Sequence, residues 1–514
     1  MRGRRVGIIG AGISGLLACK YVLEKGFEPI VFESQPGVGG VWTHTPETTK
    51  LQTSKQAYEF SDFPWPCSVK EEYPNHNQVM EYLESYALHF GLLPYIKFNT
   101  KVININYYAQ QGQDMRSWSH WGGTTDNCFS NPKGKWEITT TSAAAVQLHL
   151  ELNPKVYEVE FVILCIGRFG GIPNIPDFPP NKGPDAFVNG KVIHSMNYSA
   201  MGDSEAKKFV KGKRVTVIGF RKSALDIANE CATANGVENP CTLLYRNLYW
   251  SIPANYNPYT VLGLLFLNRF SELMLYKPGE GRFLSLLVTL LSPLLPLRKY
   301  DLVPAHRFSA DVTSCSISIA PENFYDRIEG SILLKKSKGF GFYANGLTFE
   351  DDATPPLETD IVILCTGYKG DVKLKHIFKS QTFQNYITGA LNSTVSLYRE
   401  CIHPRIPQLA AVGYSESYSN LYTSEMRCRW LAHFLEGGFK LPSIEEMEKD
   451  MLEWEKYMKR YSSRGACIGA VHVWYNDQLC KDMGCNQKRK KGFFAEILEP
   501  YGPTDYANLT PSSK

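Results

Sequence analysis

The sequence predicts an α/β fold with two Rossmann-like dinucleotide-binding domains, the second inserted into a discontinuous first domain. Two segments are typical of a strand, a glycine-containing loop and a helix: "GAGISG" at residues 10–15 and "GFRKSA" at residues 219–224. The third observation is an internal echo, because "VEFVILCIGR" (159–168) resembles "ETDIVILCTGY" (358–368). We interpret the echo as the return of the chain to the first domain. The predicted boundaries are 1–185 for the first part of that domain, 186–345 for the insertion, and 346–514 for the second part with its C-terminal helices.

The first sixty residues are typical of a β-α-β unit. "RRVGIIG" is a short apolar strand, "ISGLLACKYVLEKG" has the apolar spacing of a helix that stops at Gly26, and "EPIVFE" is the second strand. In the loop, Gly10 permits a tight turn, Gly12 lets the backbone approach a pyrophosphate, and Gly15 lets helix and strand pack closely. Glu33 ends the second strand, where a carboxylate can accept ribose hydroxyls. Together these features predict a dinucleotide site.

A second glycine cluster follows in "SQPGVGGVW", at Gly37, Gly39 and Gly40. It allows another close backbone approach, which an extended cofactor larger than NAD would use. An ordinary glycine turn is the alternative interpretation.

Five prolines between residues 173 and 184 predict a stiff connector at which the chain crosses to the second domain. "KRVTVIG" then opens the second unit, with Gly219 at the turn and Ala224 in place of the third glycine, before an amphipathic helix. The strand "CTLLYRN" ends in Arg246, where an NAD-binding protein carries an acid. An arginine there can pair with a 2′-phosphate, which favours NADPH.

Arg221 stands where this second loop would carry its middle glycine. Only glycine removes the Cβ at the closest point of phosphate approach, so the Arg221 side chain must point away from the phosphates or onto them. Arg221 and Lys222 also bring positive charge to a dianionic group. We expect Lys222, Ser223 and Arg246 to contribute more to NADPH binding than Arg221.

The composition is that of a folded cytosolic protein: 514 residues, 43% hydrophobic and 21% charged, with a net charge of +4. No long basic stripe occurs, so we expect no nucleic-acid partner. The chain enters its first strand without the pattern of a signal peptide, so its thirteen cysteines are expected to be reduced, mostly buried thiols. No C-x-x-C pair occurs, and we expect no metal site.

Two segments bear on membrane contact. The leucine-rich stretch 283–297, within the apolar region 261–297, is too short to span a bilayer and contains Pro293 and Pro296. We expect a buried helix there, with a peripheral membrane contact as the alternative. "KRKK" (488–491) is expected to be a solvated face. These features predict a cytoplasmic protein with at most a peripheral contact, at the endoplasmic reticulum, and they give no basis for predicting the oligomeric state.

Taken together, the motifs resemble those of the flavin-containing monooxygenases over nearly the whole chain. The resemblance rests on "GAGISG", Glu33, "GGVW", "LQTSKQAYEFSDFPWP", "GKVIHSMNY", the second loop and "ILCTGY". The wording of "KVIHSMNY", "KSALDIA", "CIHPRIPQLA" and "YNDQLCKDMG" resembles the plant N-oxygenating branch more than the auxin-forming branch. The best-known activity in that branch is N-hydroxylation of pipecolic acid in plant defence.

The resemblance implies specific site residues. FAD would be held by the first loop and by a flavin-side cluster, namely Gly10, Gly12, Gly15, Glu33, Gly40 and Trp42. NADPH would be held by the second unit, namely Gly219, Lys222, Ser223, Ala224 and Arg246. "LQTSK" is similar to a stretch beside the flavin ring, which makes Gln52 and Thr53 candidate catalytic residues, with a surface loop as the alternative for Gln52. His194 is expected to be structural.

The implied function is an FAD- and NADPH-dependent monooxygenase. In the family, NADPH passes a hydride to the flavin, and reduced flavin adds O₂ to give a C4a-hydroperoxide. That species oxygenates a soft nucleophile, the amine nitrogen or sulfide sulfur of a small molecule. One alternative is oxygenation of a carbonyl substrate, of the Baeyer–Villiger or decarboxylating type. The other is a non-catalytic nucleotide-sensing flavoprotein, for which Arg221 is the argument. A disulfide reductase would need a redox-active cysteine pair, and the sequence shows none.

Overall fold

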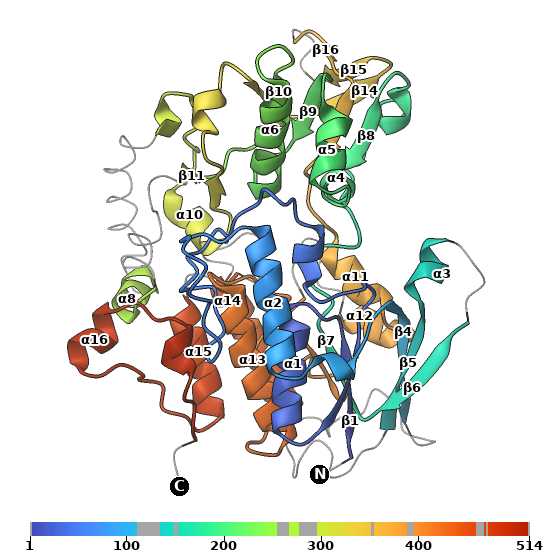
Figure 1. Ribbon diagram of the computed structural model, residues 1–514. Coiled ribbons are helices and arrows are strands. Elements are labelled where there is room, and N and C mark those ends of the chain that lie inside the picture. The colour runs from blue at the N-terminus through green and yellow to red at the C-terminus, as the bar shows by residue number, and fades with distance from the viewer. Residues whose placement is uncertain are drawn as a thin grey trace.

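Two five-stranded parallel sheets organise the computed structural model (Figure 1). The structure describes residues 3–109, 134–148, 153–253, 267–276, 296–350, 354–387, 395–458, 467–468 and 471–511. In the first sheet the strand order is β18 (Leu409–Ala411), β7 (Phe161–Leu164), β1 (Arg5–Ile9), β2 (Glu28–Phe32) and β3 (Ile96–Lys97). In the second sheet the order is β13 (Ile332–Lys336), β10 (Cys241–Tyr245), β9 (Val215–Ile218), β17 (Ile361–Leu364) and β8 (Lys191–His194).

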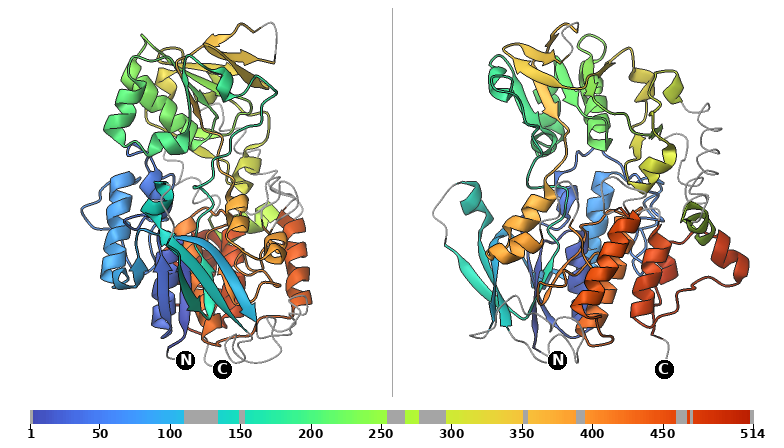
Figure 2. Two further views of the ribbon diagram at one scale, coloured as in Figure 1. Left: turned by 90° about the vertical axis from the view of Figure 1, so that its right-hand side faces the viewer. Right: turned by 180° about the vertical axis from the view of Figure 1, so that it is seen from behind.

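Each sheet belongs to one of two domains that lie one above the other in Figures 1 and 2. β7 and β17 are apolar and buried along their whole length, as expected for parallel strands covered on both faces. On the first sheet, α1 (Ile13–Glu24) packs against α13 (Asn420–Leu435), so the N-terminal loop meets the C-terminal part of the chain. The predicted two-domain α/β fold is therefore confirmed.

One strand assignment from the sequence is wrong. The echo segment 358–368 contains β17, and β17 pairs in parallel with β8 and β9 of the second sheet. The chain returns to the first sheet only at β18, which pairs with β7. We therefore propose that the inserted domain extends to about residue 366 instead of ending at residue 345.

Smaller sheets flank the two domains. The first is antiparallel and contains β4 (Thr100–Ala109), β5 (Gly134–Ser142) and β6 (Lys155–Val159). The second is also antiparallel and contains β14 (Phe340–Tyr343), β15 (Gly346–Phe349) and β16 (Leu357–Glu358). A parallel pair joins β11 (Ser251–Pro253) to β12 (Ser318–Ala320). The first and second of these sheets lie beside the lower and upper domains of Figure 2, respectively.

The remaining helices pack against these sheets or against one another. They are α2 (His76–His89), α3 (Ala143–Gln147), α4 (Ser195–Ser199), α5 (Asp203–Val210), α6 (Lys222–Asn235), α8 (Arg269–Tyr276), α10 (Phe308–Thr313), α11 (Gly370–His376), α12 (Gln381–Tyr386), α14 (Ile444–Met458), α15 (His472–Asp482) and α16 (Phe493–Leu498). His194 ends β8 and caps α4, because its Nδ1 accepts the Met196 N–H at 3.1 Å. This contact fits the structural role expected for His194.

Two sequence expectations concern the surface. The apolar stretch 283–297 lies outside the described residues apart from Pro296 and Leu297. In "KRKK" the expected solvated face is found for Lys488 and Lys491 but is wrong for two residues: Arg489 Nε donates to the Asp505 carbonyl at 2.9 Å, and Lys490 lies 2.9 Å from the Asp505 carboxylate. Among the residues described, no helix is both long and apolar enough to cross a bilayer.

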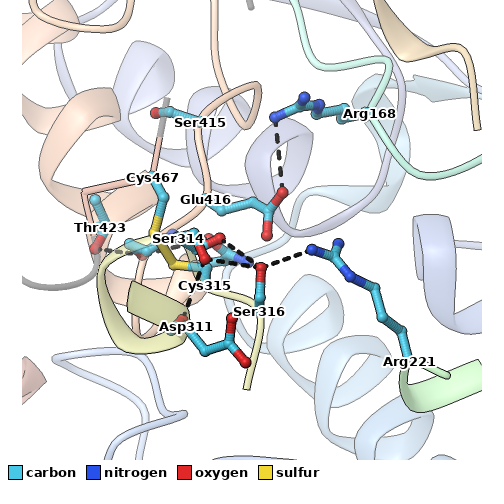
Figure 3. Close-up of a disulfide and its surroundings, with 12 residues drawn as sticks. Arg168, Arg221, Asp311, Ser314, Cys315, Ser316, Ser415, Glu416, Thr423 and Cys467 are labelled. Carbon is cyan, nitrogen blue, oxygen red and sulfur yellow. Dashed lines mark hydrogen bonds and ion pairs between the residues drawn. A yellow bond between two sulfur atoms is a disulfide. The ribbon is translucent and has the colours of Figure 1, made fainter. Parts of the chain in front are cut away.

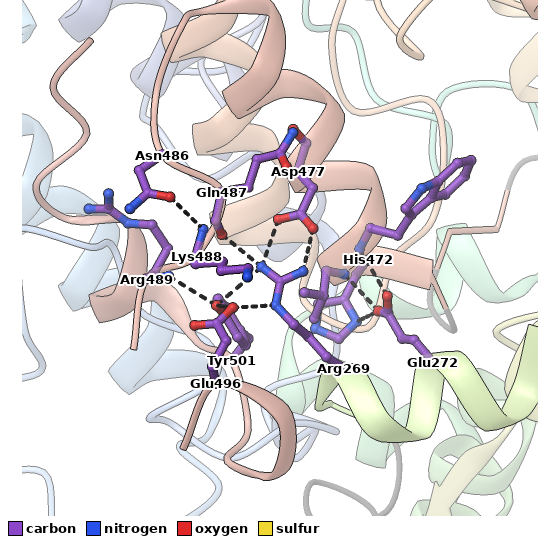
Figure 4. Close-up of polar contacts among 12 residues, drawn as sticks. Arg269, Glu272, His472, Asp477, Asn486, Gln487, Lys488, Arg489, Glu496 and Tyr501 are labelled. Atoms are coloured by element: carbon purple, nitrogen blue, oxygen red, sulfur yellow. Dashed lines mark hydrogen bonds and ion pairs between the residues drawn. The ribbon is translucent and has the colours of Figure 1, made fainter. Parts of the chain in front are cut away.

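A buried carboxylate joins α8 to the start of α15 (Figure 4). Glu272 accepts the backbone N–H groups of Val473 and Trp474 at 2.7 and 2.9 Å, which are donors that the first turn of a helix leaves unsatisfied. His472 lies 3.5 Å from the same carboxylate. Burial outweighs the two N–H groups and raises the pKa of Glu272 from 4.5 to about 8.

This pKa predicts a pH-dependent contribution to stability. Folded protein holds a proton on Glu272 up to about pH 8, whereas the unfolded chain releases it near 4.5, so the contribution is present at acid pH and is lost as the pH rises through that window. The side chain of the Glu272→Gln variant is neutral throughout. As the pH rises, the free energy of unfolding of this variant should increase relative to that of the parent chain by up to about 1.4 kcal/mol per pH unit. Urea unfolding at several pH values from 5 to 8 measures this difference. Glu445→Gln, at an exposed position of α14, is the control and should follow the parent chain. A constant offset for Glu272→Gln across this range would contradict the prediction.

Candidate functional site

The two predicted loops share one local geometry. Gly10 has φ of 103°, and a Cβ on it would lie 2.5 Å from the Cys165 carbonyl oxygen. Gly219 has φ of 138°, and a Cβ on it would lie 2.7 Å from the Cys365 carbonyl oxygen. In both places the chain turns sharply after its strand and touches the exit of the neighbouring strand. Only glycine allows that turn and that contact together.

The third loop positions differ between the two units. A Cβ on Gly15 would lie 1.8 Å from the Gly10 carbonyl oxygen, so α1 lies against the loop with no room for a side chain. In the second unit the buried Ala224 stands at the equivalent place, and its Cβ is 3.3 Å from where a Cβ on Gly219 would be. The second helix therefore sits slightly further from its loop, as the tolerated alanine indicates.

A cleft of about 630 Å³ opens beside the first loop. Four predicted cofactor residues line it, namely Gly10, Gly12, Glu33 and Gly40. Gly12 and Gly40 face each other, because a Cβ on Gly40 would lie 2.9 Å from the Gly12 Cα. The two glycine clusters thus form one continuous backbone wall. Trp42 stands behind this wall, where its indole N–H donates to the Tyr58 hydroxyl at 3.0 Å, and Tyr58 lines the cleft.

The polar groups of this cleft fit the adenosine half of a dinucleotide. The Glu33 carboxylate accepts the N–H groups of Ala11 and Gln35 at 2.6 and 2.8 Å, which fixes it at the end of β2 beside the loop. The Lys373 ammonium donates to the Ile166 carbonyl. Burial lowers the pKa of Lys373, while the nearby Glu33 opposes that shift. The first-loop side of the cleft therefore offers a fixed carboxylate, Glu33, near a desolvated cation, Lys373.

A buried hydroxyl in the lining points to a ligand. The Tyr414 hydroxyl has no hydrogen-bond partner among the described residues, although Tyr414 is only 5% exposed and lines the cleft. The first two turns of α13 contribute Asn420 and Ser424 to the lining. Helix N-termini favour anionic groups, and α1 and α13 both begin here. These residues fit the FAD that the resemblance implies: Glu33 would hold its ribose, and the first turn of α1 its pyrophosphate.

The candidate catalytic residues do not line this cleft. Gln52 instead joins the two domains, because its side-chain Oε1 accepts the Ile319 N–H of β12 at 3.1 Å. The neighbouring Thr49 hydroxyl donates to Asp226 of α6 at 3.0 Å. The segment after Trp42 is thus attached to the inserted domain, and the catalytic roles of Gln52 and Thr53 stay predictions.

Four residues of the second unit fall into two groups. The side chains of Arg221 and Lys222 are paired within the protein, whereas those of Ser223 and Arg246 are exposed. Arg221 is the N-cap of α6, and its side chain is directed away from the loop, with Nη2 donating to the Ser316 hydroxyl at 2.6 Å (Figure 3). Its guanidinium also lies 4.8 Å from the centre of the Tyr249 ring. Lys222 pairs with Asp226 at 2.6 Å. Ser223 and Arg246 are exposed, which leaves both accessible to a dinucleotide.

Several lining residues were missed by the sequence analysis. They are Arg168, Lys373, Tyr414 and Glu416, and they come from segments far apart in the chain. Arg168 directly follows the strand exit "ILCIG", which was a usable signal. Lys373, Tyr414 and Glu416 carry no comparable motif.

The expectation of reduced thiols is wrong for one pair of cysteines. Cys315 and Cys467 form a disulfide, with their Cα atoms 6.0 Å apart. The other cysteines of the described chain are free thiols, and most of them are buried. Because 152 residues separate the two partners, no spacing motif announces the bond.

Comparison with known proteins places the chain in a family. The family model described as flavin-binding monooxygenase-like matches residues 3–494. The probable flavin-containing monooxygenase 1 of Arabidopsis thaliana is 40% identical, over 98% of this chain and 96% of its own length. The dimethylaniline monooxygenase (N-oxide-forming) 2 of Mus musculus is 26% identical, over 96% of this chain and 85% of its own length.

A solved structure shares the fold. The crystal structure of OTEMO in complex with FAD and NADP has a TM-score of 0.67 and 16% identity, over 94% of this chain and 98% of that one. The two dinucleotide-binding units, the glycine-lined cleft and the match to the family model all indicate the same family. The chain belongs to the flavin-binding monooxygenase-like family and is an NADPH-dependent oxidoreductase that uses FAD.

Proposed function

We propose that this enzyme oxygenates a soft nucleophile, the amine nitrogen or sulfide sulfur of a small molecule. A cyclic amino acid such as pipecolic acid is the first candidate substrate. The observation that carries the proposal is the pairing of a glycine-walled cleft at the first loop with a second loop whose strand ends in the exposed Arg246. The name of the mouse relative, N-oxide-forming, supports nitrogen as the oxygenated atom. The resemblance to the plant N-oxygenating branch supports the amino-acid class.

The protein's own contribution would be to bind, orient and exclude water. Bound FAD would accept the hydride of NADPH and activate O₂. Gly12, Gly40 and Glu33 would hold FAD against the first sheet, and Arg246 would hold the 2′-phosphate of NADPH. The contacts of Gln52 with Ile319 and of Thr49 with Asp226 join the two domains. Such contacts would help to keep water from the reacting groups.

A product-resolved screen tests this function. The flavin-loaded protein is mixed with NADPH and air, and NADPH consumption is compared with oxygenated product for pipecolic acid, a tertiary amine, a thioether and a cyclic ketone. Matched consumption and product with an amine or thioether supports the proposal. Product only from the ketone would favour carbonyl oxygenation. Failure of NADPH to reduce the bound flavin would favour the non-catalytic nucleotide sensor.

The exposed Arg246 predicts a cofactor preference. Arg246→Ala should raise the KM for NADPH about tenfold, because one charge-assisted contact contributes about 1.5–3 kcal/mol when it is partly desolvated. The KM for NADH, which lacks the 2′-phosphate, should change little. Steady-state flavin reduction with each nucleotide measures both values. Lys208→Ala, at an exposed position of α5, is the control and should leave both KM values unchanged. Equal losses with NADPH and NADH would contradict this role.

A further inference from the structure

A disulfide joins the C-terminal part of the chain to the inserted domain (Figure 3). Cys315 follows α10 with φ of 49°, in the left-handed position that often ends a helix. The Ser316 N–H donates back to the Asp311 carbonyl at 2.8 Å, which completes the turn. Cys315 is half-buried and Cys467 is 4% exposed. Of the two partners, Cys315 is therefore the more accessible residue.

On the inserted-domain side, the disulfide is next to the second loop. Ser316 accepts the Arg221 guanidinium at 2.6 Å, and the Ser314 hydroxyl donates to Ser316 at 2.8 Å. Arg221 in turn is the N-cap of α6. The position of residues 314–316 therefore fixes the side chain that replaces the middle glycine of the loop.

On the other side, the disulfide is next to the cleft at the first loop. Cys467 forms a parallel bridge with Glu416, and the Ile468 N–H donates to the Glu416 carbonyl at 2.7 Å. The Glu416 carboxylate lies 3.6 Å from the Arg168 guanidinium. Both Glu416 and Arg168 line the cleft. One covalent bond thus connects a cleft-lining segment to the segment that holds Arg221.

We propose that Cys315 and Cys467 form a reversible thiol–disulfide site that sets how firmly the second loop is held against the first domain. A dithiol reductant attacks one sulfur, and its second thiol releases the mixed disulfide. The protein gains two electrons and two protons as two thiols, and the reductant becomes a disulfide. In the reverse direction, hydrogen peroxide oxidises one thiolate to a sulfenic acid with release of hydroxide. The second thiol displaces the sulfenic oxygen as water and reforms the bond.

Reduction removes the covalent link between the two domains and leaves non-covalent contacts such as the Gln52–Ile319 hydrogen bond, while the Arg221–Ser316 hydrogen bond stays within the inserted domain. The turn at residues 314–316 should then become more mobile, and the Arg221 side chain should become more mobile with it. The reduced protein should hold the loop 219–224 less firmly and bind NADP⁺ more weakly, by about threefold to tenfold. The change in the loop is independent of the substrate proposed above.

Three measurements on the flavin-loaded chain test the site. Protein treated with peroxide or with dithiothreitol is alkylated without further reductant and then analysed by peptide mapping. Residues 315 and 467 should be linked after peroxide and both alkylated after dithiothreitol. Hydrogen exchange should be faster at 219–224 and 314–318 in the reduced protein. Titration with NADP⁺ should show the weaker binding. Two free thiols after peroxide, or identical exchange in the two states, would overturn the proposal; both readouts stand whatever the enzyme oxygenates.

Variants separate this bond from other thiols. Cys315→Ser and Cys467→Ser should each match the reduced parent chain and no longer respond to dithiothreitol. Cys67→Ser, at an exposed free thiol, should respond as the parent chain does. A full response to dithiothreitol in either of the first two variants would also overturn the proposal. The comparison of oxidised and reduced parent chain needs no variant, so it decides the matter even where a serine variant fails to fold.

Discussion

Gly15→Ala is expected to abolish retention of FAD and to destabilise the fold by about 3 kcal/mol. A Cβ at this position would lie 1.8 Å from the Gly10 carbonyl oxygen and 2.8 Å from its carbon. Both are backbone atoms of the loop after β1, so no side chain can rotate out of the way. The loop or α1 must shift, and the wall formed by Gly12 and Gly40 shifts with it. Flavin absorbance per chain after purification and urea unfolding measure the two effects.

Two matched variants make this prediction specific. Gly37→Ala lies in the adjacent glycine cluster, where a Cβ would meet nothing within 4 Å, and it should retain FAD. Ala224→Gly tests the equivalent place in the second unit and should lower stability by about 1 kcal/mol, the helix propensity difference between the two residues. A Gly15→Ala protein that keeps a full complement of flavin, with stability within about 1 kcal/mol of the parent chain, would contradict the packing argument.

The sequence predicts the local units well because each is built from neighbouring residues. The strand before "GAGISG", the helix after it and Glu33 all lie where the motif indicates. The echo of "ILCIG" and "ILCTG" was real but misinterpreted. Each segment leaves its strand beside the first glycine of a loop, Cys165 at Gly10 and Cys365 at Gly219. The likeness records the same local contact in two sheets, and it does not indicate that both strands belong to one sheet.

Features that join distant segments could not be predicted in this way. The disulfide partners are 152 residues apart, and Lys373 and Tyr414 reach the cleft from α11 and from the loop after β18. Gln52 is a case in which a motif suggested one contact and the fold gives another. Its sequence context suggests the flavin ring, but its amide oxygen contacts β12 of the inserted domain. Contacts between domains depend on how the sheets are placed, and no short motif encodes that placement.

Arg269→Met is expected to lower stability by about 3–5 kcal/mol, because it leaves buried carboxylates without their cation. Arg269 lies at the start of α8 and reaches the C-terminal segment (Figure 4). Its guanidinium pairs with Asp477 of α15 and with Glu496 of α16, whose side chains are 10% and 9% exposed. It also donates to the Gln487 carbonyl at 2.7 Å. Methionine keeps most of the side-chain volume but makes none of these hydrogen bonds and ion pairs. The attachment of α16 to α8 should therefore be lost.

An exposed arginine provides the matched control. Arg214 also pairs with two carboxylates, Asp360 and Glu358, but its side chain is 47% exposed. Arg214→Met should therefore change the free energy of unfolding by no more than about 1 kcal/mol. Measurements at acid pH provide a second test. Burial already raises the pKa of Asp477 against the opposing effect of Arg269, so the carboxyl of the variant should take up a proton more readily. The loss in Arg269→Met should then shrink as the pH falls, whereas equal losses in the two variants at every pH would show that burial of the charges is not the cause.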